Sequence, residues 1–87
     1  MHAFLVEQYW PGVTEESFEL AADKVRASAG ELTGIRILHS TLVPDDESAF
    51  CVFAAPSAAL VAEAYRRAGV PYERILAAVD VSGEVRQ

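Results

Sequence analysis

The stretch that decides the fold is Ile35-Arg36-Ile37-Leu38-His39-Ser40-Thr41-Leu42-Val43-Pro44-Asp45-Asp46-Glu47-Ser48-Ala49-Phe50-Cys51-Val52-Phe53-Ala54-Ala55. Two runs rich in Ile, Leu, Val, Thr and Phe flank a short polar segment that contains one proline and three acidic residues. Branched and aromatic side chains favour strands, whereas proline and aspartate favour turns. The pattern predicts a β-hairpin with strands over residues 35–43 and 49–54.

The segment before the hairpin predicts a strand followed by a helix. Residues 2–9 carry apolar side chains on both faces of an extended chain, and residues 10–13 interrupt the pattern with Pro and Gly. Thr14 is a suitable N-cap, because its hydroxyl can accept a hydrogen bond from the first helical turn. The apolar stripe of this helix is formed by Phe18, Ala21, Ala22, Val25, Ala29 and Leu32. We expect the helix to end between Ser28 and Leu32.

The segment after the hairpin predicts a second helix and a last strand. Ser57 can cap the helix, and Gly69 is the expected residue at its end. Residues 75–81 form a further apolar run, and residues 82–87 form a polar tail. The resulting order β-α-β-β-α-β is typical of the ferredoxin-like α+β fold, in which two helices cover one face of a four-stranded antiparallel sheet. We therefore predict one domain over residues 1–81, with the first and third strands in the centre of the sheet.

Two helices cover only one face of such a sheet, yet the sequence supplies apolar residues for both faces. Leu5, Ile37, Val79 and Phe53 or its neighbours are the candidates for the second face. Leaving that face in water would expose a patch of roughly several hundred Å², more than soluble monomers usually show. We therefore predict a homodimer in which two open sheet faces pack together as a dimeric α+β barrel.

The composition limits the classes of partner. The 87 residues carry a formal charge of -6 at pH 7, which repels phosphate backbones and anionic lipid surfaces. The sequence therefore predicts neither a nucleic-acid partner nor a membrane partner. A single cysteine excludes an intramolecular disulfide, and no run is long enough to span a bilayer. These features favour a cytoplasmic location.

His39 and Cys51 are the two best soft metal ligands, and they fall on the two strands of the predicted hairpin. With an odd number of residues in the turn, His39 faces Cys51. With Asp45-Asp46 as the turn, Ser40 faces Cys51 and the pair is split between the faces. Glu7 or a residue of a second subunit would complete a site for nickel, zinc or copper. In the alternative interpretation Cys51 is a small buried apolar residue and His39 is hydrogen-bonded in the fold.

Several motifs resemble a family of small nickel-binding proteins, many of whose members carry only a label of unknown function. The runs at 39–43 (His-Ser-Thr-Leu-Val), 50–53 (Phe-Cys-Val-Phe) and 55–56 (Ala-Pro) resemble the family's His-Ser-Tyr-Val, Tyr-Cys-Val-Tyr and Ala-Pro motifs. Further likeness is found at 4–7, 11–12 and 67–71. The resemblance implies a ferredoxin-like homodimer with facing sheets, and a bound nickel or other divalent transition metal ion. The chain departs from the family pattern at Thr41, where Tyr is usual, and at Ala64, where many members have His.

Three functions are consistent with these observations. The first is a metal-binding homodimer, with His39, Cys51 and Glu7 as ligands. The second is a cofactor-free enzyme similar to dimeric α+β barrel monooxygenases or muconolactone-type isomerases. There Glu7 or His39 would carry a proton in a cavity between sheet and helices that binds a small apolar ligand. Alternatively Glu7 makes a structural contact with Arg36 or Arg74. The third function is a non-catalytic interaction or regulatory module on the same scaffold.

Overall fold

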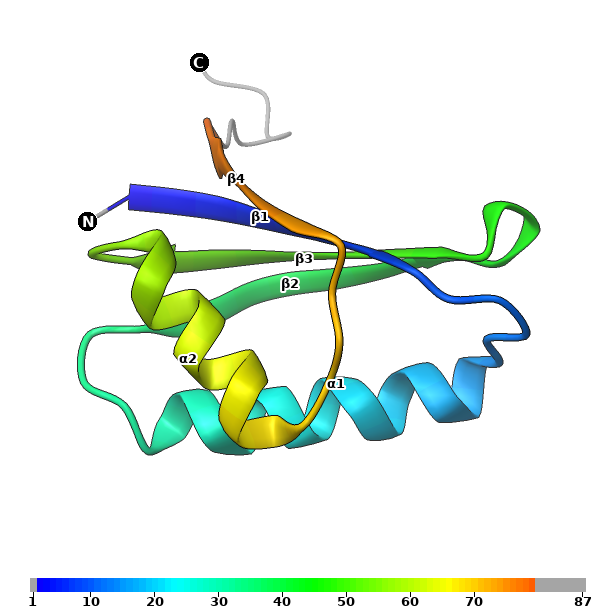
Figure 1. The fold of residues 1–87 in the computed structure, drawn as a ribbon, viewed down its shortest axis with the longest axis horizontal. Helices are drawn as coiled ribbons and strands as arrows, with labels where there is room; N and C mark the ends of the chain where they lie inside the picture. Colours follow the sequence, from blue (N-terminus) through cyan, green and yellow to red (C-terminus); the bar gives the residue numbers. More distant parts are fainter. Residues whose placement is uncertain (1, 80–87) are drawn as a thin grey trace, which may run out of the picture.

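The sheet and helices follow the order that the sequence predicts. The computed structural model describes residues 2–79 of the 87. Its elements are β1 (His2–Tyr9), α1 (Glu15–Gly30), β2 (Arg36–Val43), a short 3-10 turn (Pro44–Asp46), β3 (Ser48–Ala55), α2 (Ala58–Ala68) and β4 (Arg74–Ala78). The antiparallel sheet has the strand order β2-β3-β1-β4, and both helices lie on one side of it (Figure 1). The ferredoxin-like α+β fold is confirmed, with β1 and β3 at the centre.

The helix boundaries follow from local hydrogen bonding. The side chain of Thr14 accepts a hydrogen bond from the backbone of Ser17, and the Ser17 hydroxyl donates back to the Thr14 carbonyl. Ser57 caps α2 in the same way through the backbone N–H of Leu60. Gly69 ends α2 in the left-handed conformation, with φ of 69°, which glycine adopts without steric strain. No helix in residues 2–79 is long and apolar enough to cross a membrane.

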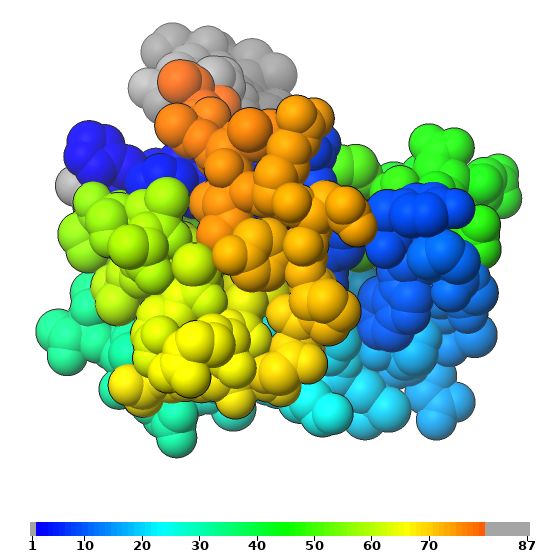
Figure 2. Space-filling view, viewed as in Figure 1, coloured from blue at the N-terminus to red at the C-terminus, as the bar shows by residue number. Residues whose placement is uncertain are grey.

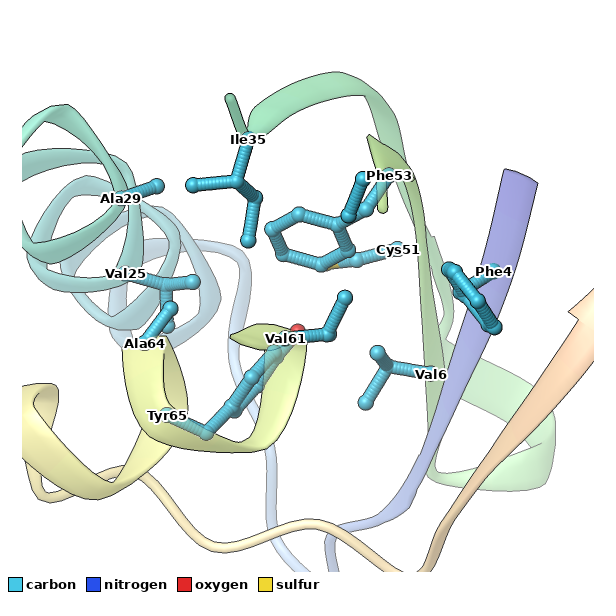
Figure 3. Close-up of a cluster of buried hydrophobic side chains, with 11 residues drawn as sticks. Phe4, Val6, Val25, Ala29, Ile35, Cys51, Phe53, Val61, Ala64 and Tyr65 are labelled. Atoms are coloured by element: carbon cyan, nitrogen blue, oxygen red, sulfur yellow. The ribbon is translucent and has the colours of Figure 1, made fainter. Parts of the chain in front are cut away.

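The core lies between the helices and the sheet. Figure 3 shows side chains of α1, α2, β1 and β3 meeting in one cluster, with Phe53 and Tyr65 near its middle. The Phe53 ring is fully buried and contacts the Tyr65 ring edge to face, with 5.7 Å between the ring centroids. The remaining members of the cluster are Phe4, Val6, Val25, Ala29, Ile35, Cys51, Ala55, Val61 and Ala64. These side chains fill the space between the layers.

The sheet face without helices, which we call the open face, differs in part from the prediction. Ile37 was expected on this face, but it pairs with the buried Phe53 on the helix side. Alternation along the strands instead places apolar side chains of all four strands on the open face: Ala3, Leu5, Val43, Phe50, Val52, Ala54, Leu76 and Ala78. Leu5 and the neighbours of Phe53, Val52 and Ala54, lie on the open face as predicted. Ile37 does not, because a bulge between Ile37 and His39 shifts the phase of β2.

The last strand is shorter than predicted. β4 ends at Ala78, and Val79 follows it with 92% of its surface exposed. Residues 80 and 81, which the sequence assigns to this strand, lie outside the described part of the chain, as does the predicted boundary between domain and tail.

Candidate functional site

The hairpin register separates His39 from Cys51. Four residues, 44–47, connect β2 and β3, so that Ser40 lies opposite Cys51 and His39 lies opposite Val52. Cys51 also pairs with Val6 of β1, whose side chain is in the core, whereas Val52 pairs with Leu5 on the open face. Of the two registers that the sequence left open, the one that splits the pair between the faces is therefore found.

Cys51 lies in the core as a small buried side chain. Only 3% of its surface is exposed, and its sulfur lies 3.0 Å from the hydroxyl oxygen of Ser40. Ala64, at the position where the resemblance implies a histidine, is fully buried in the same cluster. In place of an imidazole, the chain therefore has a methyl group packed in the core. These contacts match the alternative interpretation of Cys51 as a small apolar residue.

Tyr65 brings an unexpected polar group into this core. Its side chain extends from α2 into the cluster (Figure 3), and its buried hydroxyl has no hydrogen-bond partner among the described residues. Burial raises the pKa of this phenol, and the neighbouring Cys51 adds to the rise. Tyr65, Cys51 and Gln8 border a cavity of about 10 Å³, which is the space that one water molecule occupies. Helical spacing predicts that Tyr65 is buried, but no sequence signal identifies its unpaired hydroxyl.

We expect Tyr65→Phe to raise the free energy of unfolding by about 1 kcal/mol, because a buried hydroxyl without a partner loses its hydration on folding. Urea denaturation at neutral pH measures the change. Tyr72→Phe is the matched control: this ring contacts Tyr65 but is 38% exposed, and its substitution should leave stability unchanged. A loss of stability in Tyr65→Phe would contradict the expectation and would indicate that the hydroxyl is hydrogen-bonded to an enclosed water molecule.

Glu7 lies on the open face, but it is not a free carboxylate. It accepts a hydrogen bond from the guanidinium of Arg74, which lies directly opposite on β4. Its carbonyl also accepts a hydrogen bond of 2.7 Å from the backbone N–H of Glu73. The carboxylate and the backbone carbonyl of Glu7 therefore both bond to residues at the start of β4. This is one of the two structural contacts that the sequence offered as the alternative to a catalytic role.

His39 is exposed on the edge strand β2, beside Val52 and Leu5 in the same row of the open face. It also borders a surface depression whose opposite wall is formed by α1. One strand, β3, separates His39 from Glu7. Within residues 2–79, no group of three or more His, Cys, Asp or Glu side chains lies close enough to hold a metal ion. A single copy of the described chain therefore does not assemble a metal site from these ligands.

His39 lines an open depression of about 540 Å³ between α1 and β2, and Glu7 is not among the residues that line it. The small cavity beside Cys51 leaves no room for a substrate. A larger one, of about 450 Å³, lies at the end of the core between β1, α1 and the loop after α2. Its walls include Trp10, Leu20 and Lys24, but neither proposed proton carrier. The aromatic residues Tyr9 and Trp10 are candidate pocket residues in the sequence, but the complete cavity could not be predicted because its walls come from three separate segments.

Comparison with known proteins places the chain in a family. A search of the curated proteins finds no match. The crystal structure of SCO4226 from Streptomyces coelicolor A3(2) shares the fold, with a TM-score of 0.80 and 21% sequence identity over 93% of this chain and 99% of that chain. The family model described as nickel responsive protein SCO4226-like matches residues 4–77. The chain therefore belongs to the SCO4226-like family of nickel-responsive proteins.

Proposed function

We propose that this protein is a homodimer that binds nickel or a similar divalent transition metal ion with His39, at the interface formed by two open sheet faces. The observation that carries the proposal is the position of His39. Its imidazole is exposed on the one sheet face that no helix covers. The nickel-responsive character of the family supports the choice of ion.

The chemistry of the open face supports a second copy of the chain as its partner. Its centre is apolar, with Leu5, Phe50, Val52 and Leu76 in neighbouring positions on three strands. Although the chain carries a formal charge of -6, the four strands contain one acidic residue, Glu7, and two arginines, Arg36 and Arg74. The acidic residues lie elsewhere, so two open faces meet without strong like-charge repulsion.

Dimer formation would also explain how the protein could bind metal although residues 2–79 of one copy contain no ligand cluster. Two imidazoles or an imidazole and a carboxylate from different copies supply ligands that one copy does not bring together. In a dimer with two-fold symmetry, each ligand of one copy occurs again in the other. His39 lies near the rim of the face, on an edge strand, where the ion and its remaining water ligands have access. Cys51 is buried on the other side of the sheet and takes no part.

Equilibrium dialysis against Ni²⁺, followed by metal analysis, tests the ligand. We expect the wild-type protein to retain metal in a fixed ratio to the dimer, and His39→Ala to bind it at least about 10-fold more weakly. The chain has only one other histidine, so His2→Ala is the matched control and should retain the metal. Wild-type protein without stoichiometric metal, or full retention by His39→Ala, would contradict the proposal.

A further inference from the structure

The cavity of about 450 Å³ at the end of the core is lined neither by His39 nor by the apolar residues at the centre of the open face. It lies between the end of β1, one face of α1 and the loop that joins α2 to β4. In Figure 2 the orange loop after α2 and the blue chain that follows β1 border this region. Its volume falls within the range of small-molecule sites in proteins, about 300 to 1,000 Å³.

The walls of this cavity are held in place by hydrogen bonds between distant segments. Gln8 is buried, and its side-chain nitrogen donates to the carbonyl of Pro71 at 2.9 Å, which ties the loop after α2 to β1. Trp10 donates its backbone N–H to the carbonyl of Glu47 at 2.7 Å. The capping box of Thr14 and Ser17 fixes the start of α1. The cavity is therefore preformed, so a ligand does not have to order its walls.

The lining is mainly apolar and includes the only tryptophan of the chain, Trp10. Leu20 and Lys24 are four residues apart on α1, so they lie on the same helix face beside the cavity. Leu20 has 57% of its surface exposed, although it is a large apolar side chain. Apolar walls with an indole among them suit a flat aromatic molecule.

Lys24 supplies the polar part of recognition. It is the only lysine of the chain, and among residues 2–79 it forms no ion pair. The aliphatic part of a lysine side chain packs along apolar surface while its ammonium group stays at the rim, where it can bind an anion. Glu73, on the loop that joins α2 to β4, also borders the cavity. We propose that this cavity binds an aromatic carboxylate, with the ring against Trp10 and Leu20 and the carboxylate at Lys24.

Biphenyl-4-carboxylate, its neutral carboxamide and the corresponding benzylamine test the proposal as a matched set. Trp10 fluorescence reports binding directly, because no other tryptophan contributes, and calorimetry confirms the stoichiometry. For a carboxylate of about 15 heavy atoms we expect one site per chain and a Kd on the order of 0.1 to 1 mM. The carboxamide and the amine should each bind at least about three-fold more weakly than the carboxylate.

Two pairs of variants assign the residues. Lys24→Gln should remove the preference for carboxylate over carboxamide. Arg26 is an exposed cation on α1 that does not line the cavity, so Arg26→Gln should preserve this preference. Leu20→Ser should weaken the binding of all three probes about five-fold. Leu38 is an exposed leucine outside the cavity, so Leu38→Ser should leave their binding unchanged. Circular dichroism verifies that each variant is folded.

Three results would overturn the proposal. The first is the absence of a saturable change in Trp10 fluorescence when the carboxylate concentration reaches about ten times the expected Kd. The second is equal affinity for acid and amide in the wild-type protein. The third is tighter binding of the amine that is lost in Glu73→Gln, which would assign an aromatic cation instead. Because Trp10, Leu20 and Lys24 lie away from the open face, these outcomes are independent of metal binding by His39.

Discussion

Phe53→Ala is expected to lower the free energy of unfolding by about 3 to 5 kcal/mol. The Phe53 side chain is fully buried, with a relative exposure of 0%, and its ring contacts Tyr65 from the opposite layer. Truncation removes the buried ring and leaves a cavity that neighbours on two helices and two strands only partly fill. A domain of this size has a total stability of only about 5 to 10 kcal/mol, so a large share of it would be lost.

Urea denaturation followed by circular dichroism measures this loss. Phe18→Ala on α1 is the matched control, because the same side chain is only half-buried there. Its loss should be clearly smaller than that of Phe53→Ala. Equal losses in the two variants would contradict the placement of Phe53 at the centre of the core.

Leu76→Glu is expected to weaken the proposed dimer at least about 100-fold while leaving the monomer folded. Leu76 lies opposite Leu5 on the open face and is 36% exposed, so a glutamate stays hydrated in the single chain. In a two-fold dimer one substitution places two carboxylates in the apolar interface, and each loses hydration without a partner. Burying the two carboxylates costs several kcal/mol, which exceeds the roughly 2.7 kcal/mol that corresponds to a 100-fold change in the dissociation constant.

Sedimentation equilibrium at micromolar concentration measures the dissociation. Leu38→Glu is the control, because Leu38 is similarly exposed, at 39%, but lines the depression beside α1. This variant should remain a dimer. A wild-type protein that is monomeric at micromolar concentration would refute the interface, and equal dissociation of both variants would show that Leu76 is not specific to it.

The elements could be predicted because each depends on local chemistry. The N-cap at Thr14, the glycine at the end of α2 and the apolar runs of the strands act over a few residues, and all are found in the structure. The order of these elements leaves few topologies open, and the ferredoxin-like arrangement satisfies the rules for connections. The positions of β1 and β3 at the centre of the sheet follow from it.

The candidate site could be predicted only in part, because it depends on register. The segment 44–48 is compatible with either an even or an odd turn, and the choice decides whether His39 faces Cys51 or Val52. The left-handed conformation of Glu47, with φ of 51°, closes the even turn although glutamate rarely adopts it. The cavity beside Trp10 depends on three segments meeting in space, which no spacing in the sequence records.

The bulge at Leu38 affects more than the position of His39. β2 is an edge strand, and an unbroken edge offers a row of backbone donors and acceptors to which another chain can add. The extra residue interrupts this row and twists the strand, while β4, the opposite edge, has only five residues. Neither edge is a good template for a growing sheet. The apolar open face is therefore bordered by two edges that do not favour fibrous aggregation.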